Sequence, residues 1–205
     1  MSGTRSHWEE VYTTKAETAV SWYQPHSARS LALITSAAPD HSAAIVDIGG
    51  GASRLVDDLI ARGYTDLTVL DVAEAALAKS RVRLGRDAGK VDWVVADITT
   101  WQPPRIYDVW HDRAVFHFLT EPTLQDAYLS ALRAGTSIGS TVIMATFALD
   151  GPDKCSGLPV QRYSPATLAA RLGPIFRLTH EAEDAHKTPW GSEQRFSYAA
   201  FHRQA

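Results

Sequence analysis

Residues 43–53 read AAIVDIGGGAS, and this stretch decides the fold. The apolar run Ile45–Ile48 predicts a short buried strand, which ends at three consecutive glycines. An amphipathic helical pattern starts directly after them, at Leu55. Glycine permits a sharp turn and a close approach of a ligand to the backbone, and the free N–H groups of the following helix point toward that ligand. The stretch therefore predicts a strand, a ligand-binding turn and a helix.

Carboxylates follow the next two predicted strands. Leu67–Leu70 is a second apolar run and ends in Asp71, and Asp92–Ala96 predicts a third strand that runs into Asp97. A carboxylate at the carboxyl end of such a strand can accept hydrogen bonds from both hydroxyls of a ribose. The glycine turn together with Asp71 therefore indicates a nucleoside as ligand.

The rest of the chain continues the alternation of strands and helices. The sequence predicts helices at 27–37, 73–84 and 122–132, strands at 107–111 and 141–147, a long loop at 148–163, a helix from Ser164 and Pro165 to Gly173, and closing strands at 176–181 and 196–202. This order is typical of an α/β fold in which helices cover both faces of a parallel sheet and an antiparallel hairpin completes it.

Composition limits the class of protein. With 205 residues, of which 45% are hydrophobic and 21% charged, the chain suits a single domain: an N-terminal helical cap over 1–40, a core over 41–147, and a substrate loop, helix and hairpin over 148–205. Cys155 is the only cysteine, which excludes a disulfide or thiolate zinc site within one chain, and no metal is expected. A net charge of -3 without basic clusters excludes a nucleic-acid partner. Without an apolar run of signal-peptide or membrane-spanning length, we expect a cytoplasmic protein with no membrane partner.

The glycine stretch, with Asp71 and Asp97 at these spacings, resembles the class I S-adenosylmethionine-dependent methyltransferases over nearly the whole chain. The resemblance implies a Rossmann-like, seven-stranded sheet in the order 3-2-1-4-5-7-6 with strand 7 antiparallel. It also implies S-adenosyl-L-methionine as cofactor and S-adenosyl-L-homocysteine as its product. A dinucleotide dehydrogenase would need glycine at Arg54, which favours the methyltransferase. The residues implied to bind the cofactor are Asp47, Gly49, Gly50, Gly51, Asp71, Val72, Asp97, Ile98 and His111.

Two subfamilies share local features with this chain. The run DVWHDRAVFHFL at 108–119 resembles the small thiol and thiopurine methyltransferases, whereas W-x-x-x-Y followed by SWY is similar to lysine methyltransferases acting on translation factors. We expect an enzyme that moves a methyl group by in-line displacement to sulfur or nitrogen of a small molecule, because the loop at 148–163 and an aromatic N-terminus can enclose one. The alternatives are a protein lysine N-methyltransferase and a non-catalytic, cofactor-binding sensor.

Three consecutive residues near the end of the fourth predicted strand are the catalytic candidates. His111 or Asp112 can assist deprotonation of the acceptor, and Arg113 supplies a fixed positive charge that can orient an anionic substrate. Each has an ordinary alternative: Asp112 can cap the following helix and Arg113 can pair with an acidic neighbour.

The candidates for substrate binding are spread along the chain. They are Trp22, Tyr23, His117, Cys155, Tyr163 and Trp190. The first two belong to an aromatic N-terminal segment, with Trp8 and Tyr12, that forms either a lid over the ligand or a helix packed on the sheet edge. His117 can instead be a core-edge histidine, Cys155 a small apolar residue, and Trp190 a residue that packs the closing hairpin turn.

Overall fold

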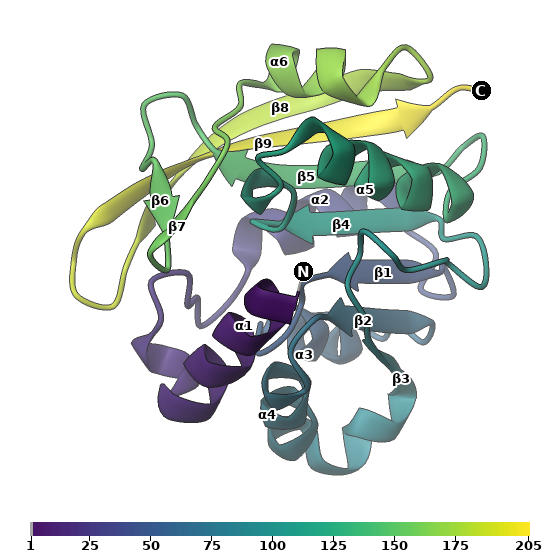
Figure 1. Cartoon of the computed structure of the whole chain (residues 1–205). Coiled ribbons are helices and arrows are strands. Elements are labelled where there is room, and N and C mark those ends of the chain that lie inside the picture. The colour runs from purple at the N-terminus through teal and green to yellow at the C-terminus, as the bar shows by residue number, and fades with distance from the viewer. Residues whose placement is uncertain (1) are drawn as a thin grey trace.

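A computed structural model describes residues 2–205, with side chains from Arg5 onward, and its centre is a seven-stranded sheet in the order β3-β2-β1-β4-β5-β9-β8 (Figure 1). The strands are β1 (Ile45–Ile48), β2 (Leu67–Asp71), β3 (Val91–Val95), β4 (Val109–Arg113), β5 (Thr141–Phe147), β8 (Phe176–Lys187) and β9 (Glu193–Arg203). β9 runs antiparallel to both of its neighbours, whereas β1 to β5 are parallel. Counted within this sheet, β8 and β9 are the sixth and seventh strands, and the expected order 3-2-1-4-5-7-6 is confirmed.

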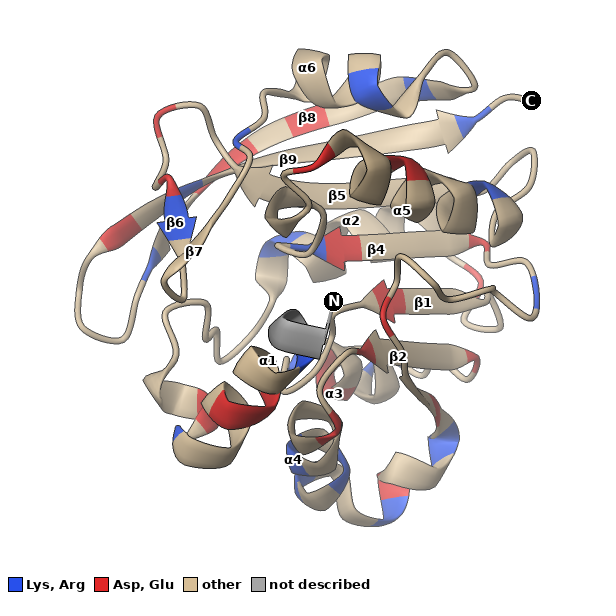
Figure 2. Ribbon diagram, in the orientation of Figure 1, with Lys and Arg blue, Asp and Glu red and all other residues tan. Residues whose placement is uncertain are grey.

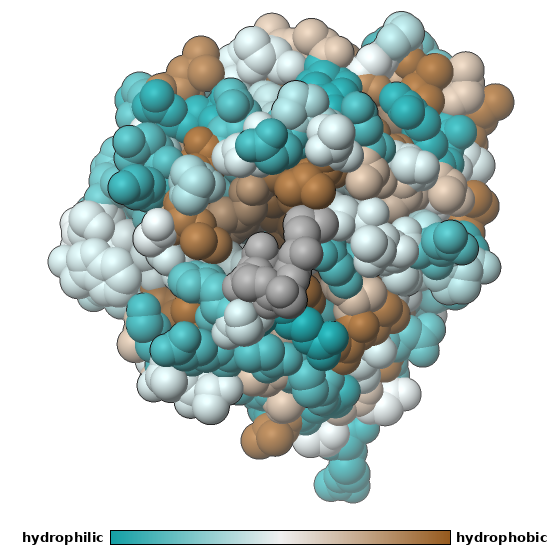
Figure 3. Space-filling model, in the orientation of Figure 1, coloured by the Kyte–Doolittle hydropathy of each residue, from teal (hydrophilic) through white to brown (hydrophobic). Residues whose placement is uncertain are grey.

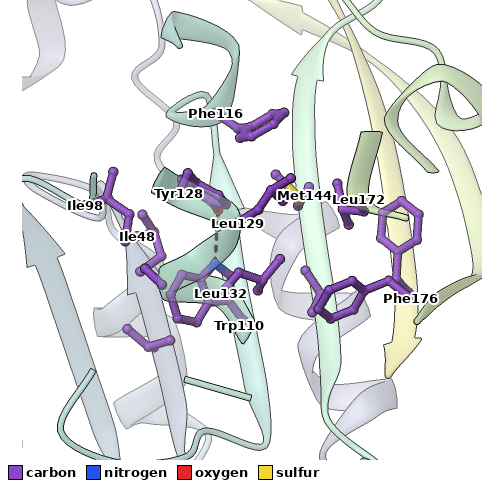
Figure 4. Close-up of a cluster of buried hydrophobic side chains, with 14 of the residues drawn as sticks. Ile48, Ile98, Trp110, Phe116, Tyr128, Leu129, Leu132, Met144, Leu172 and Phe176 are labelled. Atoms are coloured by element: carbon purple, nitrogen blue, oxygen red, sulfur yellow. Dashed lines mark hydrogen bonds between the residues drawn. The ribbon is translucent and has the colours of Figure 1, made fainter. Parts of the chain in front are cut away.

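Helices pack on both faces of the sheet. They are α1 (Ser2–Thr14), α2 (Ala28–Ala37), α3 (Leu55–Ala61), α4 (Glu74–Leu84), α5 (Pro122–Ala134) and α6 (Pro165–Leu172), with short 3-10 helices η1 (Glu17–Ala19), η2 (Gly85–Lys90) and η3 (Phe116–Phe118). Leu31 of α2, Leu55 of α3 and Leu77 of α4 share one buried cluster. Leu129 of α5 and Leu172 of α6 belong to the cluster on the opposite face (Figure 4). Within residues 2–205, no helix has the length and apolar character needed to cross a bilayer.

Successive strand residues point to opposite faces, and this alternation places the polar residues of β1 and β4. Val46 and Ile48 of β1 join the α5 cluster, whereas Ile45 joins the α2 and α3 cluster. Asp47 shares the face of Ile45 and is paired in register with His111 of β4. The two side chains therefore meet on the α2 side of the sheet.

The structure corrects several expected boundaries. β4 begins at Val109 rather than at Tyr107, because the Tyr107 N–H donates to the Gly135 carbonyl and pairing with β1 starts at Val109. β4 consequently extends through Arg113. β3, in contrast, begins and ends one residue earlier than the expected strand Asp92–Ala96.

The C-terminal quarter contains more strand than the sequence predicts. The segment 148–163 holds a small hairpin of β6 (Lys154–Cys155) and β7 (Leu158–Pro159), and β8 and β9 extend to 12 and 11 residues. Much of β8 is polar and exposed, which hides it from a search for apolar alternation. The predicted start of α6 is confirmed, because the Ser164 side chain accepts from the Thr167 N–H in a capping box.

Candidate active site

The glycine turn joins β1 to α3 at the edge where the parallel strands end. Figure 2 shows acidic segments at the arrowheads of β1, β2 and β4 on this edge. Gly49 has a φ of +68° and donates its N–H to the Leu70 carbonyl at 2.7 Å. A Cβ on Gly50 would lie 2.5 Å from Asp47 Oδ2 and 2.8 Å from Val69 Cγ1. The turn therefore depends on glycine for its conformation at Gly49 and for close packing at Gly50.

Asp71 ends β2 beside this turn and is buried. Its Oδ1 accepts the Ala73 N–H at 2.8 Å. Burial raises the pKa of Asp71 to about 7, against the effect of that hydrogen bond, and the nearby charge of Asp47 raises it further. A Cβ on Gly51 would lie 2.5 Å from Asp71 Oδ2, so glycine at 51 leaves that oxygen uncovered.

A cavity of about 160 Å³ opens at this edge, and Figure 3 shows a hollow with hydrophobic walls on the same face. Its lining includes Gly49, Asp71, Val72, Asp97 and Ile98. It also includes five aromatic side chains, which are called here the aromatic wall: Trp8, Tyr12, Trp22, Phe118 and Phe196. The cavity thus joins the predicted nucleoside site to an apolar compartment.

A second cavity, of about 60 Å³, adjoins the first. Both are lined by Tyr12, Trp22, Gly49 and Arg113. All the predicted cofactor residues except Gly51 therefore line one or both of these neighbouring cavities. Those lining the second are Asp47, Gly49, Gly50 and His111, and Tyr23 lies there as well.

His111 is buried between two polar partners. Its Nδ1 lies 2.7 Å from Asp47 Oδ1, and its Nε2 lies 2.8 Å from the hydroxyl of Ser30 on α2. Both ring nitrogens are thus occupied within the fold. The arrangement fixes the Asp47 carboxylate under the glycine turn.

Asp112 lies on the opposite face of β4 and lines neither cavity. Its carboxylate accepts the N–H groups of Val115 and Phe116 and the hydroxyl of Tyr128, the last at 2.7 Å. Trp110 Nε1 in turn donates to that hydroxyl at 3.0 Å (Figure 4). Burial raises the pKa of Asp112 to about 6. Asp112 thereby holds the turn after β4 against α5, as the capping alternative expects.

Arg113 lines both cavities. Its Nε donates to the Tyr198 hydroxyl at 3.2 Å, one terminal nitrogen donates to the Trp22 carbonyl at 3.3 Å, and the guanidinium lies 4.5 Å from the centre of the Phe196 ring. Among the side chains that the structure describes, it forms no ion pair with a carboxylate. The expected alternative, an acidic partner, is therefore not found within this part of the chain.

The candidates for substrate binding separate into two groups. Trp22, Tyr23 and Cys155 line a cavity, whereas His117 and Tyr163 are buried beside it without lining either one. Burial lowers the pKa of His117 to about 3. Trp190 is 63% exposed in the turn between β8 and β9, so it neither lines a cavity nor packs the turn.

Helix α1 lies against the cavity and against α4. The Glu9 carboxylate accepts the N–H groups of Glu74 and Ala75 at 2.7 and 3.0 Å, at the start of α4. On the same helix Trp8 contacts Trp22 and Phe118, with ring centres 5.5 and 5.2 Å apart. The N-terminal helix thus lines the cavity and also packs on α4, and its role as a lid stays a prediction.

Comparison with known proteins finds a family model and a relative that match the sequence of this chain. Residues 45–139 match a family model described as methyltransferase domain. A malonyl-[acyl-carrier protein] O-methyltransferase of Anoxybacillus flavithermus is 30% identical over 154 residues, which is 73% of this chain and 57% of that protein. The chain thus spans somewhat more than half the length of this relative. Residues 45–139 thus match a methyltransferase domain, and the chain is similar to S-adenosylmethionine-dependent methyltransferases.

Solved methyltransferase structures share this architecture. The 1,6-didemethyltoxoflavin-N1-methyltransferase of Burkholderia thailandensis, solved with S-adenosylhomocysteine, superposes with a TM-score of 0.73 at 16% identity, covering 100% of this chain and 88% of that one. A protein described in the conversion of a disulfide bond into a thioacetal group during echinomycin biosynthesis gives 0.75 at 18% identity, covering 98% and 93%. At these identities the likeness concerns the fold. Neither the thiol and thiopurine nor the lysine subfamily is singled out.

The residues of this methyltransferase chain fit the family's cofactor. Asp71 offers a carboxylate at the cavity wall, left uncovered by Gly51, and Leu70, Ala96 and Ile98 provide apolar contact there. A ribose diol matches such a carboxylate, and a flat base matches the apolar surface. S-Adenosylmethionine supplies an electrophilic methyl group when it is bound.

Several residues that line the larger cavity of the methyltransferase are not predicted from the sequence, among them Phe118, Gln194 and Phe196. Phe196 pairs with Phe147, the last residue of β5. Because β9 is antiparallel, its first residues lie at the edge where the parallel strands end, and this topology was a usable signal for Gln194 and Phe196.

Proposed function

We propose that this methyltransferase transfers a methyl group from S-adenosylmethionine to sulfur or nitrogen of a small-molecule acceptor. The observation that carries the proposal is the single cavity that is lined both by Asp71 and by the aromatic wall. A nucleoside held by Asp71 and an acceptor in contact with the aromatic wall would meet inside one apolar space. Exclusion of water and alignment of the reacting atoms are the main contributions an enzyme makes to an in-line displacement.

Individual residues have separate roles in this proposal. Asp71 and Asp97 hold the adenosyl end, and the glycine turn lies beside the methionine end. His111 acts as a positioning residue, because both of its nitrogens already contact Asp47 and Ser30. Arg113, rather than Asp112, contacts the acceptor, since Arg113 lines both cavities and Asp112 lines neither.

The packed aromatic side chains along the cavity favour a small acceptor molecule over a protein. The aromatic wall is held by ring contacts between Trp8, Trp22 and Phe118, and α1 is fixed to α4 through Glu9. One similar protein is a 1,6-didemethyltoxoflavin-N1-methyltransferase and another is a malonyl-[acyl-carrier protein] O-methyltransferase, so the two differ in the kind of acceptor. The acceptor class therefore has to be measured on this protein.

Calorimetry and labelling test the proposal together. Purified protein is titrated with S-adenosylhomocysteine, and Asp71→Ala is compared with Asp66→Ala, a carboxylate at the opposite end of β2 that pairs with Arg105. We expect Asp71→Ala to weaken binding at least about tenfold and Asp66→Ala to leave it unchanged. Tritiated methyl from S-adenosylmethionine should then appear in the small-molecule fraction of a cell extract. Label confined to a protein band would contradict the small acceptor.

A further inference from the structure

The Arg113 side chain is half-buried, and the hydrogen bonds of its guanidinium are incomplete. Its second terminal nitrogen, Nη2, is shielded from solvent and has no hydrogen-bond partner within the described residues. The other two nitrogens have only neutral acceptors, the Tyr198 hydroxyl and the Trp22 carbonyl. Burying a charge without an opposite charge is costly, and the cost is removed when an anion binds to it.

The surroundings of Arg113 place this charge on the acceptor side of the cavity. Its guanidinium lies over the Phe196 ring, and Trp22 and Cys155 line the same space. Arg113 ends β4 and Phe196 belongs to β9, whereas Asp71 ends β2 and Asp97 follows β3, on the other side of β1 in the sheet. The cation therefore lies on the β4 and β9 side of the cavity, away from the predicted nucleoside site.

A second unpaired group lines the same cavity. Gln194 Oε1 is buried and accepts no hydrogen bond from the residues that the structure describes. An amide oxygen needs a donor, whereas Arg113 needs an acceptor. A ligand that satisfies both groups carries an anionic oxygen at one point and an N–H, O–H or S–H at another.

We propose that the acceptor is a small, apolar or aromatic monoanion, whose carboxylate-type group binds Arg113 and whose hydrogen-bond donor faces Gln194. A single charge is favoured over a phosphate dianion, because Arg113 is the only basic side chain among the described residues that line the larger cavity. The aromatic wall supplies the apolar contact. This inference rests on the proposed function, and it specifies the acceptor class.

Matched acids and amides test this proposal. Protein saturated with S-adenosylhomocysteine is titrated calorimetrically with benzoate, 3-hydroxybenzoate and 4-hydroxybenzoate, with the three corresponding benzamides, and with phenyl phosphate. We expect at least one acid to bind about tenfold or more tightly than its amide and more tightly than phenyl phosphate. The proposal is overturned if no acid exceeds its amide, or if phenyl phosphate binds best.

Variants of Arg113 and Gln194 test whether these two side chains cause the tighter binding of acids than of amides. Arg113→Gln should abolish the preference of acid over amide, Arg113→Lys should retain part of it, and Gln194→Met should weaken the hydroxybenzoates more than benzoate. Arg195→Gln is the matched control, because Arg195 is an exposed arginine paired with Asp150 and Glu183 outside the cavity. A preference that persists in Arg113→Gln would contradict the inference.

Binding of S-adenosylhomocysteine separates the two proposals. If it binds with wild-type affinity to Arg113→Gln and the acid preference is lost, both proposals stand. If wild-type protein binds S-adenosylhomocysteine but prefers no acid, only the acceptor class fails. If wild-type protein does not bind S-adenosylhomocysteine, the proposed function itself fails. A loss of S-adenosylhomocysteine affinity in Arg113→Gln, with the preference of acid over amide unchanged, would assign Arg113 to the cofactor and overturn the inference.

Discussion

His111 and Asp47 face each other from neighbouring strands, with Nδ1 2.7 Å from Oδ1 and both side chains almost fully buried. Removing one member of such a pair leaves the other without its partner in the interior, which is destabilising. His111→Ala should lower the free energy of unfolding by about 3 kcal/mol. Ser30→Ala, which removes only the contact at Nε2, should cost about 1 kcal/mol. Urea denaturation followed by circular dichroism measures both free energies of unfolding. If the two variants lost the same small amount of stability, the positioning role of His111 would be contradicted.

The chain of hydrogen bonds from Trp110 through Tyr128 to Asp112 gives a second prediction. Tyr128→Phe deprives the indole N–H of its acceptor and the carboxylate of a donor, and both groups stay buried. The free energy of unfolding should fall by about 2 kcal/mol. Since none of the three lines a cavity, the affinity for S-adenosylhomocysteine should remain within about twofold of wild type. A change in affinity without a change in stability would place this cluster in the binding site.

The glycine turn predicts a contrast between two alanine substitutions. Gly50→Ala introduces a Cβ that overlaps Asp47 Oδ2 and Val69 Cγ1. It should destabilise the protein by about 1–3 kcal/mol and weaken binding of S-adenosylhomocysteine, because the turn must shift. Gly89→Ala is the control, since a Cβ there meets nothing within 4 Å. Thermal unfolding and calorimetry of the two variants should differ accordingly, and similar behaviour would rule out the packing argument.

Asp71 predicts a pH dependence of ligand binding. Only the ionised carboxylate accepts hydrogen bonds from both ribose hydroxyls, and the pKa of Asp71 is raised to about 7 by burial. The affinity for S-adenosylhomocysteine should therefore rise as the pH increases from 6 to 8. Calorimetry across this range, with Asp71→Asn as the control that flattens the profile, checks the prediction. An affinity that falls with increasing pH in the wild type would contradict it.

Asp71 also makes the stability of the protein depend on pH, and stability falls over the pH range in which ligand affinity rises. The folded-state pKa of Asp71, about 7, lies above the ordinary value of 3.8 for this carboxyl group, so the folded protein holds this proton at pH values where the unfolded chain has released it. The contribution of Asp71 to stability is therefore full below about pH 4 and is lost as the pH rises to about 7. Without ligand, Asp71→Asn should remove that decline. Urea denaturation at several pH values measures the difference between the two proteins.

The central part of the fold follows from local sequence, whereas the acceptor side does not. Ile45–Ile48, the glycines and Asp71 form a contiguous strand, turn and helix unit, whose residue types are dictated by backbone geometry and burial. The end of β4 was placed two residues too early, because an apolar run does not show where hydrogen bonding to β1 begins and ends. Gln194 and Phe196 reach the cavity only through the antiparallel pairing of β9 with β5. Such long-range pairing is not encoded in any short window of sequence.

The aromatic wall allows ligand binding to be followed by the intrinsic tryptophan fluorescence of the protein. Trp8 and Trp22 lie at the cavity surface, and their indole emission depends on the polarity and the contacts of that space. Compounds that enter it should change the intrinsic fluorescence without any attached dye. The double variant Trp8→Phe and Trp22→Phe should lose this change in fluorescence. The remaining tryptophans, Trp93, Trp101, Trp110 and Trp190, should then emit with an intensity that does not depend on the ligand. A collection of unlabelled metabolites can thus be screened in multiwell plates before any radioactive assay is set up.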